Sequence, residues 1–383
     1  MAGYSVLIAA DSFKGSASSI QVENLIERGI RRVLPDCKVL KYPIADGGEG
    51  TVAALMAARR GERRHVKVRG PLGDEVEASY AIDGDGEDAV IEMAQASGIT
   101  LIPQTPENAL RASTFGVGQL ILDALNTGVK RIFIGLGGSA TNDGGAGMAK
   151  ALGVRFLNKE SDDIPCGLGG LEHLRSIDCL RIDRRVAQTR FVALTDVSNP
   201  LVGPDGALRI YGPQKGLEFA EIGQFDQWMS SYAELLNNIA DYDVADIPGA
   251  GAAGGLGAGL AAFCGAEIQS GIDTVLDIIG IEEGMRHVDL VITGEGRMDS
   301  QSANGKAPIG VALRAKKYGV PVIAVVGSRA QDLGEVYGKG IDLVLDGISE
   351  PMALEQCMNR VDETIPLAAE TAMRAFLLSR PRS

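Results

Sequence analysis

The residues best suited to chemistry lie in one stretch, residues 289 to 308, which reads DLVITGEGRMDSQSANGKAP. Its start, Asp289 to Thr293, predicts a buried parallel strand that ends in a small polar residue. The segment after this strand carries two acids and two bases, namely Glu295, Arg297, Asp299 and Lys306. Because ligands of open α/β sheets bind beyond the carboxyl ends of the strands, we expect a site for a phosphorylated ligand and its metal. A solvated turn is the alternative, although it would need only one or two turn-forming residues.

A second candidate segment follows the apolar run Val6 to Ala10. Its sequence, DSFKGSASS, precedes an apolar stripe at helical spacing that begins at Ile20, which predicts a strand, a loop and a helix. Lys14 stands just ahead of this helix, where a cation opposes the helix dipole unless an anion binds there too. A lysine with its ammonium group in water is the alternative. Asp11 and Ser12 could orient a metal or a substrate hydroxyl in the same loop.

Two glycine-rich segments also precede predicted helices. In ADGGEGT, Asp46 and Glu49 lie three residues apart, so they could hold a divalent cation or polyol hydroxyls, or merely cap the helix. The other segment, GLGGSATNDGGAGMA, begins at Gly135 and offers backbone NH groups of the kind that bind phosphate oxygens. It is not a Walker A motif, because GxxxxGK followed by Ser or Thr occurs nowhere in the chain. We expect a phosphate cradle of another architecture.

Two further residues follow a predicted strand that ends at Thr195. Asp196 stands at the carboxyl end of this strand, where it could act as a general base or a metal ligand. Asn199 precedes a proline. Asp and Asn are also common in turns that bind no ligand. YGPQKG, at residues 211 to 216, adds a glycine-flanked lysine. GAGAAG, at 249 to 254, matches GxGxxG but follows a polar segment broken by proline, so we expect close helix packing or a cleft lining there instead of nicotinamide binding.

Composition excludes several classes of protein. A formal charge of −13 leaves no basic stripe for nucleic acid. The uncharged run from Ile247 to Ala266 is rich in glycine and poor in large apolar residues, so we expect no membrane span. Five cysteines without a CxxC pair indicate unpaired thiols in a reducing compartment, and the N-terminus does not read as a signal peptide. We therefore expect a soluble cytoplasmic enzyme.

The order of strand and helix patterns predicts an α/β protein. The N- and C-terminal parts alternate strand and helix, which favours a Rossmann-like, doubly wound parallel sheet. The pattern of apolar and polar residues changes after Pro71, where short alternating strands and turns are typical of antiparallel sheet. We therefore expect residues 1–70 and 285–383 to form one domain, and residues 71–284 to form an inserted mixed α/β domain.

Seven motifs, in order and over nearly the full length, resemble those of the bacterial glycerate kinase family. They are DSFKGS, ADGGEGT, GLGGSATNDGGAGMA, TDVSNPL, YGPQKG, PGAGAAGGLGAGL and ITGEGRMDSQSANGKAP. The resemblance implies phosphorylation of D-glycerate by ATP, with magnesium, in glyoxylate or sugar-acid salvage. Much of this family makes 2-phosphoglycerate, and related chains are described as making the 3-phosphate.

On this reading the candidate residues take provisional roles. Phosphoryl transfer depends mainly on positioning and on neutralising charge. Lys14 and Lys306 would act as cationic clamps, and Asp196 would orient or deprotonate the glycerate hydroxyl. The ATP phosphates would lie on the glycine loop, with Gly137, Gly138, Ser139 and Thr141 as the binding residues.

Substrate and metal would take the remaining candidates. Arg297 could grip the glycerate carboxylate through two parallel hydrogen bonds. Ser12 and Asn199 are further substrate-binding candidates. Magnesium would be held by acids among Glu295, Asp299 and Asp46.

Two rival functions remain open at this point. A regulator could bind a nucleotide or a sugar acid with the same loops and without catalysis, but a sensor has no need of both lysines and every loop acid. A nicotinamide-dependent oxidoreductase would take GAGAAG at face value. The sequence leaves the position of phosphorylation and the oligomeric state open, and a homo-oligomer is allowed.

Overall fold

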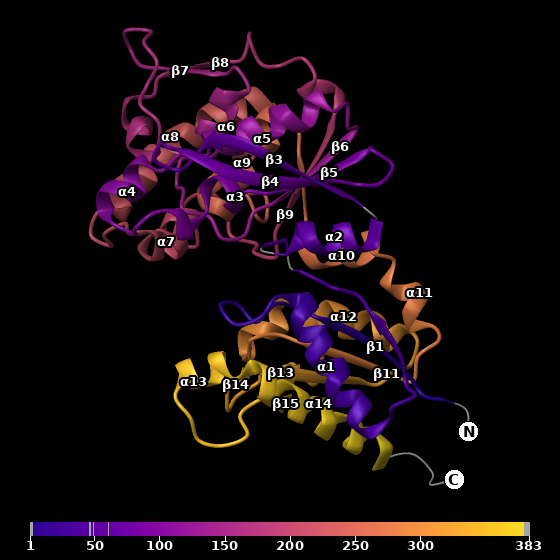
Figure 1. Cartoon of the computed structure of the whole chain (residues 1–383). Helices are drawn as coiled ribbons and strands as arrows, with labels where there is room; N and C mark the ends of the chain where they lie inside the picture. Colours follow the sequence, from indigo (N-terminus) through magenta and orange to yellow (C-terminus); the bar gives the residue numbers. More distant parts are fainter. Residues whose placement is uncertain (1–2, 46, 49, 60, 379–383) are drawn as a thin grey trace. The chain divides into compact units, whose positions relative to one another are not determined.

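The computed structural model describes residues 3–45, 47–48, 50–59 and 61–378, and the chain divides into two compact units. Unit 1 combines Met1–Asp46 with Ile272–Ser383, and unit 2 is Gly47–Gly271. In Figure 1 the indigo N-terminal segment and the orange to yellow C-terminal segment both belong to unit 1. Unit 2 is therefore an insertion in the sequence of unit 1.

Unit 1 is built on a parallel sheet with the strand order β15-β13-β11-β1-β2. Its elements are β1 (Ser5–Ala10), α1 (Ser19–Val33), β2 (Lys38–Lys41), α10 (Gly271–Ile278, which starts on the last residue of unit 2), α11 (Ile281–Met285), β11 (Leu290–Gly294), β12 (Arg297–Met298), α12 (Ala307–Lys317), β13 (Val322–Val326), β14 (Ser328–Arg329), β15 (Leu343–Asp346), α13 (Leu354–Asn359) and α14 (Val361–Leu378).

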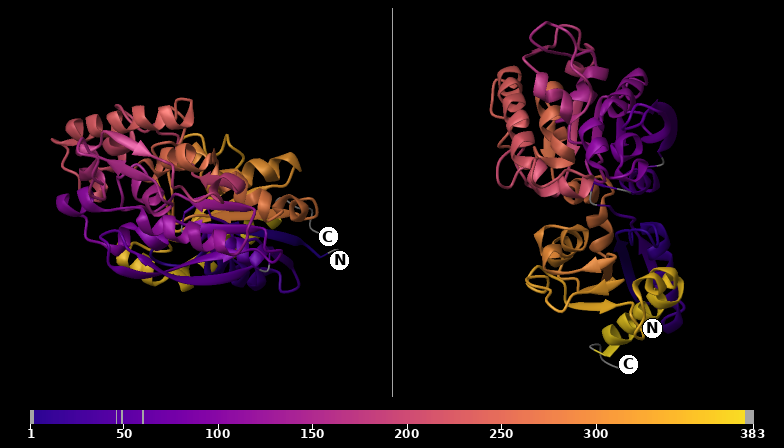
Figure 2. Two further views of the ribbon diagram at one scale, coloured as in Figure 1. Left: turned by 90° about the horizontal axis from the view of Figure 1, so that it is seen from above. Right: turned by 90° about the vertical axis from the view of Figure 1, so that its left-hand side faces the viewer.

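Helices cover both faces of this sheet. Strands β11 and β13 are buried along their whole length, as apolar parallel strands between two helix layers must be. On one face Val6, Ile8 and Ile292 pack with α1 and α14, while α12 lies on the other face (Figures 1 and 2). Because side chains alternate along a strand, both faces need apolar residues, which explains why these strands read as continuous apolar runs.

The strand order creates a switch point between β1 and β11. From β1 the chain continues to β2 at one edge, whereas β11 leads to β13 and β15 at the other. At such a point the loops beyond the carboxyl ends of the two strands diverge and leave room for a ligand. Those loops begin at Asp11 and Glu295. The predicted Rossmann-like, doubly wound parallel sheet is confirmed.

Unit 2 contains a mixed sheet with the order β10-β9-β6-β5-β4-β3, antiparallel at β5-β4-β3 and parallel elsewhere. Its elements are α2 (Thr51–Arg59), β3 (Glu62–Arg69), β4 (Glu75–Ile82), β5 (Asp88–Glu92), α3 (Ala94–Ser97), α4 (Pro106–Arg111), α5 (Phe115–Asn126), β6 (Arg131–Gly135), α6 (Ala146–Ala151), β7 (Arg155–Leu157), β8 (Ser176–Asp178), β9 (Arg190–Leu194), α7 (Ala207–Tyr211), α8 (Ile222–Ala240), α9 (Ala252–Cys264) and β10 (Glu267–Gln269). The predicted mixed α/β middle region is confirmed.

The compact units begin and end at other residues than the predicted domains. Strand β3 pairs with β4 along its full length, so residues 62–69 belong to the middle sheet instead of the segment 1–70. Its sequence, ERRHVKVR, is mostly exposed and polar, and it therefore gave no alternating apolar signal. Helices α10 and α11, placed in 71–284 by the sequence, belong to unit 1. That each unit folds as a separate domain stays a prediction.

Helices within the described residues are all too short or too polar to cross a membrane.

Candidate active site

Unit 1 contains a cavity of about 650 Å³ at the carboxyl ends of its strands. The segments that line it begin at Asp11, Glu295, Gly327 and Gly347, directly after β1, β11, β13 and β15. This is where a doubly wound sheet binds its ligands. The volume falls within the roughly 300 to 1,000 Å³ that small-molecule sites usually enclose.

The cavity brings together five residues that the sequence singled out from opposite ends of unit 1. They are Ser12, Lys14, Glu295, Arg297 and Lys306, and the cavity also contains Asp11, which the sequence placed beside Ser12 as a possible metal or hydroxyl ligand. Asp299, predicted as a metal ligand, is not among the lining residues. Its carboxylate instead accepts a hydrogen bond of 3.0 Å from the backbone N–H of Gln301 and caps the short helix 300–304. Metal binding by Asp299 stays a prediction, and Asp46 lies outside the described residues.

Lys14 is presented by a turn that is hydrogen-bonded to itself. The backbones of Phe13 and Ala17 exchange hydrogen bonds of 2.8 and 3.0 Å, and Gly15 between them has a φ of 78°, in the left-handed region that favours glycine. The exposed Lys14 side chain therefore leaves a fixed loop at the mouth of the cavity. Next to it, the buried Oγ of Ser12 makes no hydrogen bond to any described residue.

Glu295 is the buried acid of the cavity, with 6% of its surface exposed. Its Oε2 lies 3.4 Å from Nζ of Lys306, while its buried Oε1 has no hydrogen-bond partner among the described residues. Burial raises the pKa of Glu295, and the hydrogen bond from Ser302 and the charge of Lys306 act against that rise. A buried carboxylate oxygen without a partner is costly, so this atom is suited to a cation.

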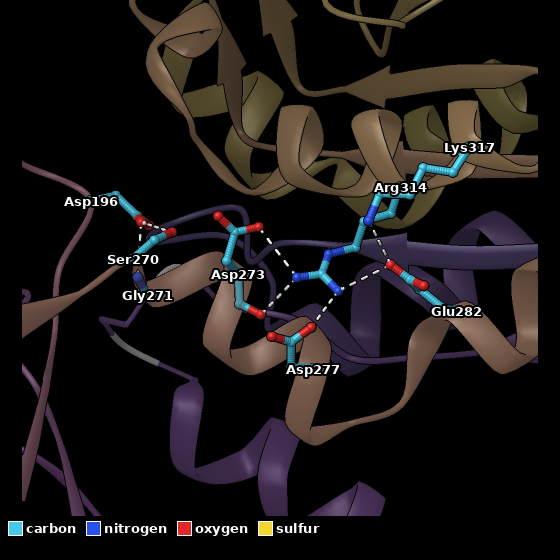
Figure 3. Close-up of polar contacts among 8 residues, drawn as sticks. All are labelled: Asp196, Ser270, Gly271, Asp273, Asp277, Glu282, Arg314 and Lys317. Carbon is cyan, nitrogen blue, oxygen red and sulfur yellow. Dashed lines mark hydrogen bonds and ion pairs between the residues drawn. The ribbon is translucent and has the colours of Figure 1, made fainter.

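Lys306 is held in place by the helix that it precedes. It is the N-cap residue of α12, and Arg314 on the same helix is buried against α10 and α11. The Arg314 guanidinium donates to the backbone oxygen of Asp273 at 3.0 Å and also pairs with Asp277 and Glu282 (Figure 3). This cluster lies outside the predicted site residues, although two acids four residues apart on α10, Asp273 and Asp277, were a visible signal in the sequence.

In unit 2 the glycine loop 135–145 is held by a buried carboxylate. Asp143 accepts hydrogen bonds from the backbone N–H groups of Thr114, Gly145 and Gly147 at 2.8 to 3.1 Å, and from the Thr114 hydroxyl. Burial raises the pKa of Asp143, and these donors act against the rise. The Asp143 carboxylate therefore holds the backbone of this loop in one conformation.

Lys215 holds the same loop from another side. Only 4% exposed, it donates from Nζ to Ser139 Oγ at 2.8 Å and to the backbone oxygen of Thr141 at 2.7 Å. Burial lowers the pKa of this lysine to about 7, and the charge of Asp143 opposes the change. The sequence noted this glycine-flanked lysine but gave it no role. Its contacts identify it as a residue that orders the loop.

The four predicted ATP-binding residues of this loop also have structural roles in the fold. A Cβ atom on Gly137 would lie 2.6 Å from the Cα of Gly48, and Gly138 has a φ of 74°. Ser139 and Thr141 contact Lys215 as described, although the buried Thr141 Oγ1 has no hydrogen-bond partner among the described residues. Their binding of ATP phosphates stays a prediction.

Asp196 and Asn199 lie in the segment that follows β9. The Oδ1 of Asp196 accepts hydrogen bonds from Ser270 Oγ and from the N–H of Gly271, both at 2.9 Å (Figure 3). Asn199 donates to the backbone oxygen of Asp205 at 2.8 Å and accepts from the Tyr211 hydroxyl at 2.7 Å. Asp196 therefore ties the segment after β9 to residues 270 and 271, and Asn199 organises its own segment. The catalytic role of Asp196 and the substrate-binding role of Asn199 stay predictions.

The GAGAAG segment packs as the sequence predicted. A Cβ atom on Gly254 would lie 1.9 Å from the backbone oxygen of Thr141, and Gly144 N–H donates to the Gly254 oxygen at 3.0 Å. The glycines thus allow the first turn of α9 to lie directly on the loop 141–144.

This fold and this cavity define an α/β enzyme of the doubly wound type with a cationic site at its switch point. A model of the glycerate kinase family matches residues 6–377. The chain belongs to this family, which confirms the resemblance seen in its motifs. By family it is a kinase, a phosphotransferase with an alcohol group as acceptor.

Individual relatives agree over the full length. The chain is 49% identical to a glycerate kinase of Halalkalibacterium halodurans, covering 95% of this chain and 96% of that protein. It is 48% identical to glycerate 2-kinase of Escherichia coli, covering 94% of each chain. The crystal structure of a putative glycerate kinase 2 from Salmonella typhimurium LT2 matches with a TM-score of 0.85 at 44% identity, covering 98% of this chain and 99% of the other.

Proposed function

We propose that this chain transfers the γ-phosphoryl group of ATP to the 2-hydroxyl of D-glycerate, giving 2-phosphoglycerate and ADP. The name of the Escherichia coli relative, at 48% identity, favours the 2-position. The 3-hydroxyl is the alternative acceptor.

One observation carries this proposal, namely the cavity of unit 1 with Lys14, Lys306 and the buried Glu295 in its lining. Phosphoryl transfer spreads negative charge over the transferred group, and fixed cations stabilise that charge. Lys14 stands on a hydrogen-bonded turn and Lys306 at the start of a helix, so the backbone that carries each lysine is fixed before the ligand arrives. Arg297 lies 3.9 Å from Asp299 and has 71% of its side chain exposed, so this weak exposed ion pair would let it turn toward the carboxylate of glycerate.

Magnesium fits the acids of this cavity. Within the described residues there is no group of three or more metal-ligating side chains, so the protein alone would not cage an ion. Mg²⁺ is commonly bound by one or two carboxylates together with substrate phosphates. Glu295, whose Oε1 has no hydrogen-bond partner among the described residues, would hold the ion, which would supply neutralising charge to the phosphates.

Asp196 is the proposed group that orients or deprotonates the glycerate hydroxyl. Its Oδ1 is engaged by Ser270 and Gly271. A carboxylate with one oxygen fixed by hydrogen bonds has a defined orientation, which favours a positioned base. The cytoplasmic location and a homo-oligomer stay predictions.

The test is an assay of ADP release with purified protein, ATP, Mg²⁺ and D-glycerate, followed by phosphorus NMR of the product. We expect ADP release that depends on glycerate, with a product signal coupled to the single proton at C2. A signal coupled to the two C3 protons would assign the 3-position instead. No ADP release above the glycerate-free control would refute the proposal.

A further inference from the structure

The cavity of unit 1 has two chemically different ends. One end is formed by the charged and hydroxyl residues already described. The other end is apolar and comes from the segment that follows β15 and from the first turns of α14. Its side chains are Ile348, Met352, Leu354, Met358, Val361 and Ile365. D-Glycerate is small and polar throughout, so neither the apolar end nor a volume of about 650 Å³ is accounted for by that substrate.

We propose that the apolar end binds the adenosine moiety of ATP, with the phosphates extending toward Lys14 and Lys306. This inference rests on the proposed function, since it takes ATP as the phosphoryl donor. It places the nucleoside within unit 1, in a part of the sequence to which the motifs gave no role.

The two ends are continuous at the Lys14 turn. A Cβ atom on Gly15 would lie only 3.0 Å from the Cε of Met358, so Met358 packs directly beside the turn that presents Lys14. A ligand that contacts Lys14 through phosphate therefore has an apolar surface next to it. A nucleotide has the same arrangement, with charged phosphates at one end and a flat, mostly apolar base at the other.

The methionines of the apolar end suit an aromatic base. Methionine sulfur makes favourable contacts with aromatic rings, and its flexible chain adapts to a flat ligand. Met352 and Met358 are both half-buried, so each keeps surface available for contact. The cavity thus offers an apolar, sulfur-bearing wall for the base beside a cationic end for the phosphates.

Cys357, which is half-buried and lines the cavity, provides a direct test by alkylation. The rate of its reaction with iodoacetamide is followed by mass spectrometry of peptides, with the exposed Cys166 of unit 2 as the internal control. We expect ADP to slow the reaction of Cys357 at least about fivefold and inorganic tripolyphosphate to have little effect, because only ADP carries a base. Equal protection by both compounds, or protection of Cys166 in place of Cys357, would overturn the proposal.

A set of variants provides a second, independent test. ADP affinity is measured by calorimetry for Met358→Glu, Met358→Leu and Leu367→Glu, the last being an exposed residue of α14 outside the cavity. We expect Met358→Glu to weaken ADP binding about tenfold or more, because it places a carboxylate against the base. Met358→Leu conserves volume and should bind within about threefold of the parent protein, as should Leu367→Glu. Unchanged ADP binding in folded Met358→Glu would refute the inference.

These results are separable from the failure of the proposed function. If the parent protein releases ADP only with glycerate while Met358→Glu binds ADP normally, the adenosine site is wrong and the kinase activity stands. If ADP protects Cys357 but no glycerate-dependent ADP release is found, nucleotide binding stands and the proposed reaction is wrong.

Discussion

Both units carry lysines and acids in glycine-rich loops, but they use them differently. In unit 1 the charges line an open cavity, where Lys14 is exposed and one oxygen of Glu295 makes no hydrogen bond to a described residue. In unit 2 Lys215 and Asp143 are buried and bonded to the backbone and hydroxyls of their own loop. We therefore expect similar residue types to serve a ligand in unit 1 and the fold in unit 2.

This difference shows which charged residues are expected to control rate and which to control stability. A group that faces a cavity can be removed at little cost to folding, because it has few partners in the protein. A buried group with several hydrogen bonds leaves those partners unsatisfied when it is removed. The contrast between the two units can therefore be tested residue by residue.

The largest expected effect is on turnover, in Lys14→Ala. Loss of a fixed cation that faces the transferred phosphoryl group should lower the turnover rate by about 100- to 1,000-fold. The thermal midpoint should stay within about 1 °C of the parent protein because the side chain is exposed. Lys316→Ala is the control, since the Lys316 side chain pairs with Asp342 at the exposed surface and with no other acid among the described residues. Parent-like turnover in Lys14→Ala would contradict the contrast.

Asp196→Ala tests the acid of unit 2 that is assigned to chemistry. As a general base it should contribute about 100-fold to turnover. Ser270→Ala is the matched control, because it removes one of the hydrogen bonds to the same Oδ1 atom. We expect Ser270→Ala to lower the rate by less than about tenfold, since the Gly271 bond remains. Equal losses of turnover in Asp196→Ala and Ser270→Ala would mean that Asp196 positions the segment at residue 270 and does not act as the base.

Asp143→Ala should act on stability. The substitution leaves the N–H groups of Thr114, Gly145 and Gly147 without their acceptor in a buried site. We expect the free energy of unfolding in urea to fall by about 3 kcal/mol or more. Asp143→Asn keeps one acceptor oxygen and should lose less. A fall below about 1 kcal/mol in Asp143→Ala would show that the loop does not depend on this acid.

Lys215→Met should change how stability depends on pH. Burial lowers the pKa of Lys215 to about 7, against 10.5 for an ordinary lysine. Between about pH 7 and 10.5 the unfolded chain binds the proton more strongly than the native protein, so the unfolding free energy rises with pH in this window. Below pH 7 the penalty of the buried charge is fully present.

The measurement is urea unfolding of the parent protein and Lys215→Met at several pH values from 6 to 10. The free energy of unfolding of the parent protein, relative to that of Lys215→Met, should increase as the pH rises above 7. A difference that is independent of pH would mean that Lys215 titrates like an exposed lysine in the folded protein.

The sequence predicted the apolar strands and the loops after them well, because a buried parallel strand reads as a continuous apolar run. Strand β1 was predicted at Val6 to Ala10 and spans Ser5–Ala10, and β11 was predicted within one residue at each end. Strand β3 was missed because its side chains are mostly exposed and only its pairing with β4 makes it a strand. Pairing between distant segments leaves no local pattern in such a polar sequence.

The sequence predicted which residues belong to the candidate site, but it did not predict the role of each charged residue. The motifs named Lys14, Glu295 and Lys306, which the fold brings to one cavity. Lys215 looked like one more loop lysine, and only its burial shows that it holds Ser139. The apolar end of the cavity gave no signal, because Met352 and Met358 lie outside every motif that the sequence predicted. Burial and partners, which separate these cases, are properties of the folded chain.

Calorimetry of ATP binding tests the contrast between the units most directly, in the absence of glycerate. The parent protein is compared with the double variant Lys14→Ala/Lys306→Ala of unit 1 and with Lys215→Met of unit 2. We expect ATP affinity to fall about 100-fold or more in the double variant, which loses two charge-assisted contacts, and to stay within about threefold in Lys215→Met. Parent-like affinity in the double variant, with a large loss in Lys215→Met, would contradict the assignment of ATP to the cavity of unit 1.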